Sequence, residues 1–350
     1  MSGGHFHALR VGGIDAAADD AVAIRFEVPD GLREAYRFEP GQYLTLRHGE
    51  WRRAYSICSQ PGQPLRVGVR RVAGGAFSGW LHRALKVGDR LDVMTPEGRF
   101  GAALAQRPRH LLAVAGGSGI TPLLAIVSAA LQADPDSRCT LVCGNRRAAS
   151  MMFRDELLDL KDRYLPRFAL HSVFSREEVD APLHAGRIDA ARLAAVLRLA
   201  GPVDQAFVCG PAALNDVAES ALRAAGLAPA QIHIERFGLP PQAQALAPAA
   251  PQADDAATAR VRLVRDGVAR EITFRPGDGS LLGAAVRAGL DLPYSCRSGM
   301  CATCRARLLE GRVRMDRNFA LEPDEVAAGF VLACQAHPQT ERVVLSFDER

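Results

Sequence analysis

The sequence has no apolar run long enough to cross a bilayer, and it contains almost no lysine. A transmembrane helix needs about 20 predominantly apolar residues, and no such stretch is present. Residues 1–10 lack the apolar segment of a secretory signal, so we expect a cytoplasmic protein. Only Lys86 and Lys161 are lysines among 43 basic residues, a composition typical of a GC-rich genome.

Neither sign of charge is in large excess. The chain has 43 basic and 39 acidic residues, a formal net charge of +4, and this balance argues against nucleic-acid binding. Apolar residues form 48% and charged residues 23%, as in average globular proteins, which argues against long disorder and against a disulfide-dense miniprotein. A length of 350 residues predicts two or three domains.

The eight cysteines fall into two groups of four. The scattered group is Cys58, Cys139, Cys143 and Cys209. The other group lies in one C-terminal stretch and consists of Cys296, Cys301, Cys304 and Cys334. Without an export signal, disulfides are a poor explanation for either group, and the clustered set predicts a metal site.

The clustered cysteines have the spacing C-x4-C-x2-C with a fourth about thirty residues later. This spacing is typical of a plant-type [2Fe–2S] site, whereas structural zinc usually uses two C-x-x-C pairs. Zinc stays open as the alternative. A Rieske site needs two histidines, and only His337 follows a cysteine suitably, so we expect it to be an ordinary loop or surface residue. The segment 259–350 resembles the plant-type ferredoxin family, which implies a β-grasp fold.

The sequence divides into four segments that differ in composition and in predicted secondary structure. Residues 1–105 form short strand-like runs typical of an antiparallel β-barrel or sandwich. Residues 106–238 alternate strands with helices, as in a parallel α/β sheet. Residues 239–258 are rich in Pro, Ala and Gln and read as a linker, although an alanine-rich helix is the competing interpretation. Residues 259–350 form a small mixed domain.

Several local patterns predict particular elements. Helices are expected at 122–131, 151–162 and 280–288. Asp266-Gly267 predicts a hairpin turn, and a strand pair is expected around Glu310-Gly311.

Two motifs in the first domain suit a flavin nucleotide. Arg53-Ala-Tyr55-Ser56 offers a guanidinium for phosphate, an aromatic ring and a hydroxyl on one strand. By itself it could be a half-buried strand with a solvated arginine. Gly75 and Ser78 stand at the start of a short helix, which is a place where a pyrophosphate can bind. A pyrophosphate favours FAD over FMN.

Further motifs in the second domain suit a nicotinamide nucleotide. Gly117, Gly119 and Thr121 lie in a glycine-rich turn between a strand and a helix, with Pro122 in the first helical turn. A turn of purely structural meaning is the alternative. Cys209-Gly210 ends a later strand, at the edge where open α/β sheets bind ligands.

Two more sites end neighbouring strands. Ser175 and Arg176 end one strand, where a solvated loop is the alternative to a ligand-binding loop, and one of Arg146 and Arg147 could assist such a loop. Glu235 and Phe237 close the second domain.

Taken together, these motifs resemble the ferredoxin–NADP reductase superfamily over essentially the whole chain. The resemblance implies that Arg53 and Ser78 hold FAD phosphates, that Tyr55 stacks on the flavin and that Ser56 lies near its N5. It also implies that Cys209 lies beside the nicotinamide. The remaining implied roles are those of Ser175 and Arg176 at the NADPH 2′-phosphate and of Glu235 and Phe237 near the flavin.

Within the superfamily, five stretches are similar to the reductases of phenylacetyl-CoA 1,2-epoxidases. They are residues 34–38, 53–58, 150–154, 207–213 and 321–325. This resemblance implies that electrons pass from NADPH to FAD, then to the [2Fe–2S] cluster, then to a multicomponent diiron oxygenase. A Rieske dioxygenase or another monooxygenase is the alternative partner, and a zinc-stabilised nucleotide-binding adaptor is the alternative of another class.

Overall fold

The structure is a computed structural model that describes residues 5–238 and 252–349, which divide into two compact units. The larger unit holds residues 7–51 and 55–238, and the smaller is built mainly on residues 252–349. Residues 239–251 of the expected linker lie outside the described residues. No helix within the described ranges is both long and apolar enough to span a membrane.

The larger unit begins with an antiparallel β-barrel, and helix α1 (Ala76–Arg83) lies between its last two strands. Its strands follow the order β4-β3-β6-β1-β2-β5. Their bounds are β1 Phe6–Ala18, β2 Ala21–Glu27, β3 Tyr43–His48, β4 Trp51–Ser56, β5 Leu65–Arg70 and β6 Arg90–Met94. Just after β4, Ile57 bridges Val67 of β5, and this bridge closes the sheet.

Strand β5 shows how the barrel divides its side chains between two faces. Leu65, Val67 and Val69 are at most 4% exposed and belong to the barrel core. Because side chains alternate along a strand, Arg66 and Arg70 lie on the other face. That face points out of the barrel core.

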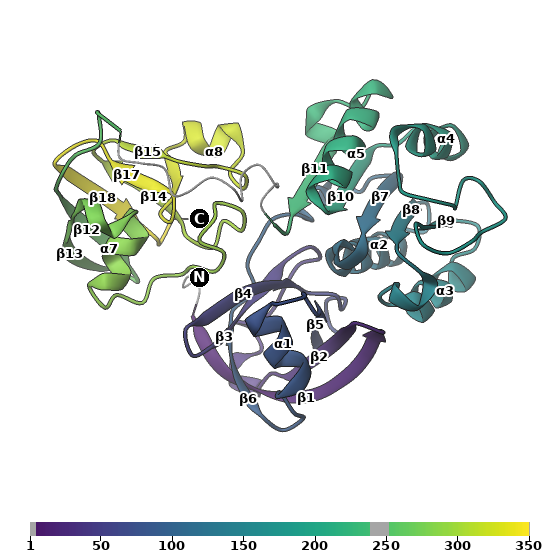
Figure 1. The fold of residues 1–350 in the computed structure, drawn as a ribbon, viewed down its shortest axis with the longest axis horizontal. Coiled ribbons are helices and arrows are strands. Elements are labelled where there is room, and N and C mark those ends of the chain that lie inside the picture. The colour runs from purple at the N-terminus through teal and green to yellow at the C-terminus, as the bar shows by residue number, and fades with distance from the viewer. Residues whose placement is uncertain (1–4, 239–251, 350) are drawn as a thin grey trace. The chain divides into compact units, whose positions relative to one another are not determined.

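The second half of the larger unit is a five-stranded parallel sheet in the order β11-β10-β7-β8-β9. Its strands are β7 His110–Gly116, β8 Arg138–Asn145, β9 Phe168–Phe174, β10 Gln205–Gly210 and β11 Ile232–Arg236. Its helices are α2 Ile120–Ala133, α3 Arg154–Arg163, α4 Ala190–Ala200 and α5 Ala212–Ala224. Figure 1 shows α2 and α3 on one face of the sheet and α4 and α5 on the other.

Two hydrophobic clusters hold these layers together. On the fully buried β7, Leu111 and Ala113 pack into the cluster of α2 and α3. Leu112 and Val114, pointing the opposite way, pack into the cluster of α4 and α5. The continuous apolar run of β7 is therefore the signature of a sheet covered on both sides.

The expected helix at 151–162 begins three residues late. Helix α3 starts at Arg154 because Phe153 has the left-handed φ of 58°, which ends any helical path from Met151. A large aromatic residue in this region is strained and is retained only where its surroundings hold it. The ring of Phe153 is buried, at 4% exposure.

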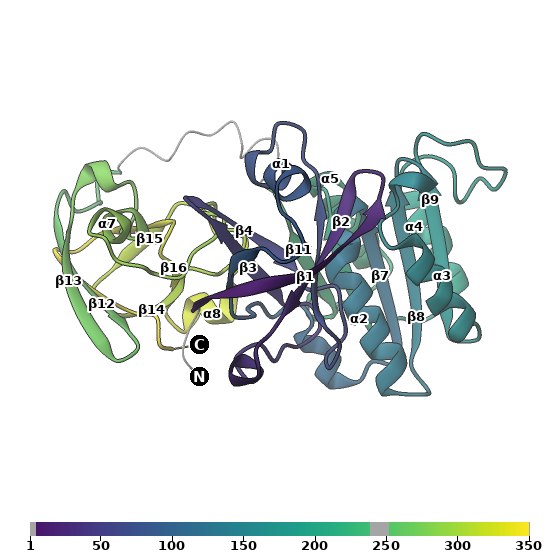
Figure 2. The ribbon, with the colours of Figure 1, turned by 90° about the horizontal axis from the view of Figure 1, so that it is seen from below.

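The smaller unit contains a mixed sheet in the order β13-β12-β18-β14-β16, crossed by α7 (Leu281–Arg287). Its strands are β12 Ala259–Arg265, β13 Val268–Phe274, β14 Arg305–Glu310, β16 Phe330–Leu332 and β18 Arg342–Ser346, with β12 and β18 parallel. A short pair, β15 Val313–Met315 and β17 Ala336–Pro338, and helix α8 Pro323–Ala327 complete it (Figure 2).

Two local expectations in this unit have different outcomes. Asp266 and Gly267, with φ of 53° and 71°, form the expected turn between β12 and β13. The strand pair expected around Glu310-Gly311 is wrong, because β14 pairs with β16 and β18 whereas β15 pairs with β17. The glycine joins strands of two separate sheets.

Residues 252–258 are held against this unit by a chain of charged side chains. The guanidinium of Arg314 donates to both carboxylate oxygens of Asp255, at 3.0 and 2.7 Å, and also pairs with Asp316. Nε2 of His337 lies 2.8 Å from the other oxygen of Asp316. His337 is 6% exposed, so its expected place at an ordinary loop or surface position is wrong. We call these four side chains the Arg314 network.

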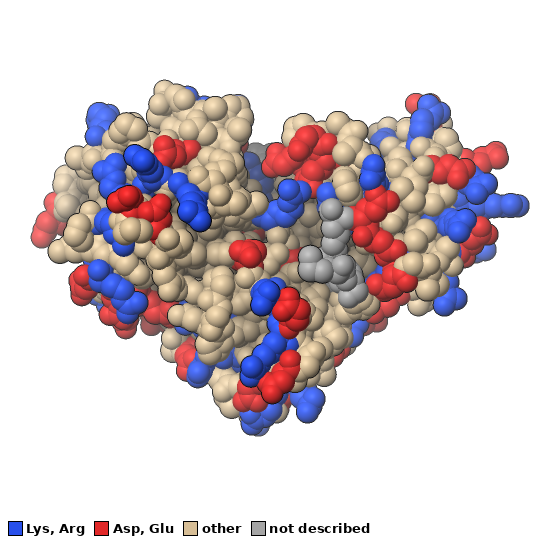
Figure 3. All heavy atoms as spheres, turned by 180° about the vertical axis from the view of Figure 1, so that it is seen from behind, with Lys and Arg blue, Asp and Glu red and all other residues tan. Residues whose placement is uncertain are grey.

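The outer surface is mixed in charge. Figure 3 shows arginines and lysines interspersed with acidic residues over the face that it presents, as the near-balanced composition predicts. No large field of one sign is visible on that face.

Candidate functional site

Three strands of the parallel sheet bring chemically distinct residues side by side at their carboxyl ends. In the register of the sheet, Ala115 of β7 is opposite Cys209 of β10, and Cys209 is opposite Glu235 of β11. The carboxyl ends of parallel strands are where open α/β sheets bind ligands. The sheet therefore puts Cys209 and Glu235 at the edge expected for a binding site.

The barrel supplies a third residue to this place. The hydroxyl of Ser56, at the end of β4, donates to Oε2 of Glu235 at 3.3 Å. Ser56 is 4% exposed and Cys209 is fully buried. The structure thus brings together Ser56, Cys209 and Glu235, three of the residues singled out from the sequence.

Burial changes the acid–base chemistry of this cluster. It raises the pKa of Glu235 to about 8, and the hydrogen bond from Ser56 only partly offsets it. It also raises the pKa of Cys209, with a further contribution from the charge of Glu235. Because a thiolate is the reactive form of cysteine, Cys209 is a neutral thiol here and is suited to packing against a ligand rather than to nucleophilic attack.

The two flavin motifs meet on the barrel. The ring of Tyr55 on β4 lies 6.2 Å from the ring of Phe77 in α1, and Arg53 shares the exposed face of β4 with Tyr55 by strand alternation. Helix α1 starts after Gly75 without a side-chain cap, which leaves its first N–H groups for a ligand. Ser78 is buried, and its Oγ accepts from the N–H of Val72 at 3.1 Å.

The glycine-rich turn lies directly against Cys209. A Cβ built at Gly119 would lie 1.9 Å from the carbonyl oxygen of Cys209, so only glycine allows this approach. Gly117 has φ of 56° and nothing within 4 Å of its Cβ position. The hydroxyl of Thr121 donates to the carbonyl of Ser118 at 2.9 Å, and α2 begins without a side-chain cap. Open space beside uncapped N–H groups fits a phosphate.

The proposed 2′-phosphate loop lies after β9. The N–H of Ser175 donates to the carbonyl of Asn145 at 3.0 Å, and that of Arg176 to Arg146 at 2.9 Å, so the loop continues the pairing of β8 and β9. Both residues are exposed. Phe237, just after β11, is 46% exposed.

The four clustered cysteines come together in two pairs within the smaller unit. The thiol of Cys296 is hydrogen-bonded to that of Cys301, and Cys304 to Cys334. Electrostatic interactions link the pairs, Cys296 with Cys334 and Cys301 with Cys304. Thiols from one loop and one distant segment are the ligand type of a [2Fe–2S] site. Within residues 5–238 and 252–349, however, no group of three or more His, Cys, Asp or Glu side chains is spaced to hold a metal ion.

Backbone N–H groups surround these sulfurs. The N–H groups of Ser298 and Met300 both lie 3.4 Å from Sγ of Cys296, and the hydroxyl of Thr303 lies 3.1 Å from Sγ of Cys301. The hydrogen bond from Cys301, with those from Ser298 and Met300, lowers the pKa of Cys296. Donors that stabilise negative sulfur fit a cluster held by thiolates.

Three family models match successive parts of the chain. An oxidoreductase FAD-binding domain matches residues 10–101, an oxidoreductase NAD-binding domain matches 113–220, and a 2Fe-2S iron-sulfur cluster binding domain matches 263–339.

Curated relatives cover nearly the whole chain. One component protein of the 1,2-phenylacetyl-CoA epoxidase of Escherichia coli is 46% identical over 99% of this chain and 98% of its own. The ferredoxin reductase component of the 3-ketosteroid-9-alpha-monooxygenase of Rhodococcus rhodochrous is 34% identical over 97% and 96%. The chain belongs to the ferredoxin–NADP reductase superfamily, in the branch with a C-terminal [2Fe–2S] domain.

Solved structures agree with this membership. Phthalate dioxygenase reductase superposes with a TM-score of 0.61 at 26% identity, covering 98% of both chains. A type IV self-sufficient cytochrome P450 monooxygenase gives a TM-score of 0.70 at 24% identity, over 97% of this reductase and 41% of the P450 chain, which shows the shared fold.

The reductase is thus an oxidoreductase that uses FAD, NAD(P)H and a [2Fe–2S] cluster. Inspection of the sequence missed one buried residue beside its site. Asn215 of α5 is fully buried, and its Nδ2 donates to the backbone carbonyl of Glu235 at 3.3 Å. Nothing in the sequence distinguishes Asn215 from other polar residues of an amphipathic helix.

Proposed function

We propose that this reductase passes electrons from NADPH, through FAD and the [2Fe–2S] cluster, to a diiron oxygenase that epoxidises phenylacetyl-CoA. The observation that carries the proposal is the 46% identity over nearly the full length to a component protein of such an epoxidase. We further propose that it works in the cytoplasm and that the reductase itself does not bind the thioester.

Electron counting explains why three redox stations are needed. NADPH gives up a hydride, which carries two electrons, whereas a [2Fe–2S] cluster accepts one electron at a time. FAD supplies the exchange between the two modes when it is bound. One NADPH therefore yields NADP⁺, a proton and two electrons that leave singly.

The residues described above take the following proposed roles in the barrel. Arg53 and the N-terminus of α1, with Gly75 and Ser78, hold the FAD phosphates. Tyr55 covers one face of the flavin ring, and Ser56 donates toward its N5. The contact between Tyr55 and Phe77 supports a single flavin site, because it joins the strand motif to the helix motif.

The nucleotide half takes the remaining proposed roles. Gly117, Gly119 and Thr121 cradle the dinucleotide phosphates, while Cys209 and Gly210 border the nicotinamide. Ser175 and Arg176 bind the 2′-phosphate and thereby favour NADPH over NADH. Glu235 and Phe237 lie near the flavin, with Glu235 available to hold a proton.

The smaller unit is proposed to pass the electrons on to the oxygenase. We assign Cys296, Cys301, Cys304 and Cys334 as the cluster ligands. We also propose that residues 1–105 bind FAD, that residues 106–238 bind NADPH and that residues 259–350 hold the cluster. The paired thiols and the N–H groups directed at Cys296 support this assignment over structural zinc.

Reconstitution tests the proposed partner. The purified reductase is combined with NADPH, phenylacetyl-CoA and the oxygenase subunits of a diiron epoxidase, and epoxide formation is followed against NADPH consumption. The expected result is product that requires all components. A reductase that supports a Rieske dioxygenase or a ketosteroid monooxygenase instead would contradict the proposal, and the 34% identity to the ketosteroid reductase component makes that comparison informative.

A further inference from the structure

Strand β5 presents a stripe of three residues, Arg66, Gly68 and Arg70, on the face that is not part of the barrel core. All three contact the nucleotide half of the same unit. We propose that this stripe is a positioning device that holds the nicotinamide site in register with the flavin site, with Arg66 as its principal positioning residue.

Arg66 joins the two halves through a two-pronged ion pair. Its Nη1 and Nη2 donate to Oε1 and Oε2 of Glu156 in α3, at 2.8 and 2.7 Å. The guanidinium also lies 5.1 Å from the ring centre of Phe153. The side chains of Arg66 and Glu156 are 19% and 43% exposed, so the pair is partly shielded from water. A bidentate arginine–carboxylate pair fixes direction as well as distance.

The same arginine is connected to the flavin strand. Nη2 of Arg66 donates to the carbonyl of Cys58 at 3.3 Å, and the N–H of Cys58 donates back to the carbonyl of Arg66 at 2.9 Å. Cys58 is two residues beyond Ser56, whose hydroxyl contacts Glu235. Arg66 therefore connects helix α3 to the segment that carries the proposed flavin N5 donor.

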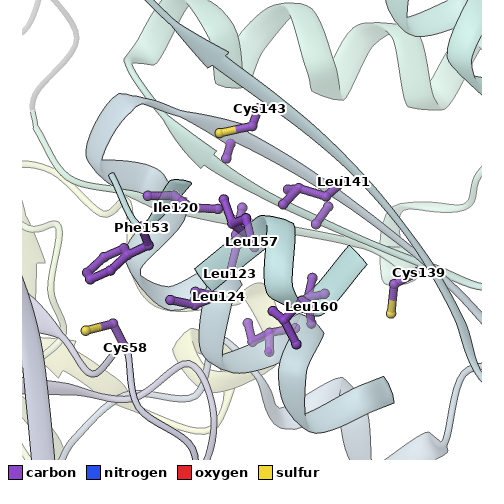
Figure 4. Packing of buried hydrophobic residues seen from close by; sticks show 14 of the residues in the cluster. Cys58, Ile120, Leu123, Leu124, Cys139, Leu141, Cys143, Phe153, Leu157 and Leu160 are labelled. Carbon is purple, nitrogen blue, oxygen red and sulfur yellow. The ribbon is translucent and has the colours of Figure 1, made fainter. Parts of the chain in front are cut away.

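Packing between the halves supports this connection. Figure 4 shows Cys58 of the barrel together with Phe153 and Leu157 of the nucleotide half, and all three belong to one buried cluster. The N–H of Phe153 donates to the carbonyl of Ala17 in β1 at 3.0 Å. This contact from the barrel helps to hold Phe153 in its left-handed conformation.

Gly68 brings β5 against the proposed phosphate cradle. A Cβ at Gly68 would lie 2.6 Å from Cγ2 of Thr121 and 3.0 Å from both Met152 and Phe153. The barrel strand thus touches the glycine-rich turn through a position where no side chain fits. Any shift between the halves would move Thr121 relative to the flavin strand.

Arg70 forms the third contact. Its Nη2 donates to the carbonyl of Ser150 at 2.6 Å, and its Nη1 to Asp20 at 3.3 Å. The N–H of the neighbouring Asp19 donates to the carbonyl of Ala149 at 3.1 Å. The segment before α3 is therefore bound to the barrel at several points along its length.

Hydride transfer makes such a device necessary. Reacting atoms must approach to about 3–3.5 Å, and a displacement of about 1 Å can cost roughly a hundredfold in rate. The two ligands would be bound by different halves of the unit, so the contacts between the halves set that distance. This role rests on the proposed function of Ser56, Cys209 and the glycine-rich turn.

The test compares Glu156→Gln and Arg66→Lys with wild type by stopped-flow measurement of NADPH-driven flavin bleaching. Each variant keeps a hydrogen-bonding group but loses the two-pronged charged pair. The rate constant of hydride transfer should fall about tenfold to a hundredfold, whereas FAD content should be unchanged. The NADPH KM should change less than about threefold and the Tm by less than about 2 °C.

Two further variants complete the experiment: one in a control ion pair of similar exposure, and one in which the charges of Arg66 and Glu156 are exchanged. Arg47 and Asp92 form a 3.0 Å pair of similar exposure, 25% and 40%, between two barrel strands, so Asp92→Asn should leave hydride transfer unchanged. The double variant Arg66→Glu/Glu156→Arg restores the ion pair but not the bond to the carbonyl of Cys58, so its hydride transfer should be faster than in either Arg66→Glu or Glu156→Arg alone and slower than in wild type.

Three outcomes would overturn the positioning role: unchanged hydride transfer in Glu156→Gln, a loss that only tracks lost flavin, or an equal loss in Asp92→Asn. Absence of NADPH-driven flavin reduction in the wild type would instead contradict the proposed function. The two failures are therefore distinguishable.

Discussion

The hydroxyl of Ser56 donates to a carboxylate oxygen of Glu235 at 3.3 Å, and this bond joins the last residue of a barrel strand to the last strand of the parallel sheet. It is a contact between the flavin half and the nicotinamide half at the place where both ligands are proposed to meet. Its chemistry depends on pH, because burial raises the pKa of Glu235 to about 8.

Glu235→Gln should change how stability depends on pH. In the folded protein Glu235 stays protonated up to a pKa of about 8, whereas in the unfolded chain it ionises near the ordinary glutamate pKa of 4.5. Between these values the folded state binds more protons, so the wild type loses stability as pH rises. In thermal unfolding measured from pH 5 to 9, the Tm of the wild type should fall relative to that of the variant, because the variant carries no ionisable group at position 235. Parallel curves would contradict the raised pKa.

Cys301→Ser should separate two activities. Reduction of cytochrome c requires the cluster and should be nearly abolished, whereas NADPH-driven ferricyanide reduction proceeds from the flavin and should be retained. Iron content and the electron paramagnetic resonance signal of the reduced protein check the loss of the cluster. Cys139→Ala, at a buried thiol of the nucleotide half, is the control and should keep both activities. Equal loss of both activities in Cys301→Ser would refute the proposed electron order.

Arg176→Ala should weaken NADPH binding selectively. A charge-assisted hydrogen bond contributes about 1.5–3 kcal/mol, so the NADPH KM should rise about one to two orders of magnitude. The KM for NADH, which lacks the 2′-phosphate, should change little. Steady-state kinetics with both nucleotides measure the ratio, with the exposed Arg198→Ala as the control. A preference for NADPH that survives the change would rule out this role.

Gly119→Ala should damage nucleotide use without removing the flavin. The new Cβ would lie 1.9 Å from the carbonyl oxygen of Cys209, so the glycine-rich turn has to move. NADPH-driven flavin reduction should fall about a hundredfold or more, because displacement of the bound nucleotide by about 1 Å is enough for that loss. Gly31→Ala, where nothing lies within 4 Å of the Cβ position, is the control. Normal turnover in Gly119→Ala would mean that the turn does not position the nucleotide.

Local patterns predicted the parts of this protein that depend on neighbouring residues in the chain. The helix capped by Ser280 was predicted within one residue, and the Asp266-Gly267 turn lies where it was expected. Cysteine spacing predicted the [2Fe–2S] domain, because three of the proposed ligands lie within nine residues. Such features are decided by turn chemistry and periodicity, which are readable locally.

Contacts between distant segments could not be predicted in the same way. Arg66 and Glu156 are ninety residues apart, and neither stands in a recognisable motif. The alternation of β5 predicts that Arg66 and Arg70 share a face, but not that this face contacts α3. Similarly, the pattern around Glu310 predicts two strands, but not that β14 and β15 belong to different sheets. These pairings are set by tertiary packing.

The Arg314 network has a consequence for how reductases of this kind could exchange parts during evolution. Asp255 precedes the first strand of the smaller unit, yet it is 7% exposed and bound to Arg314. A recombination point placed just before β12 would separate the carboxylate from its arginine and leave a partly buried charge without its partner, which is costly. Recombination points that leave the smaller unit stable should therefore lie before Gln252.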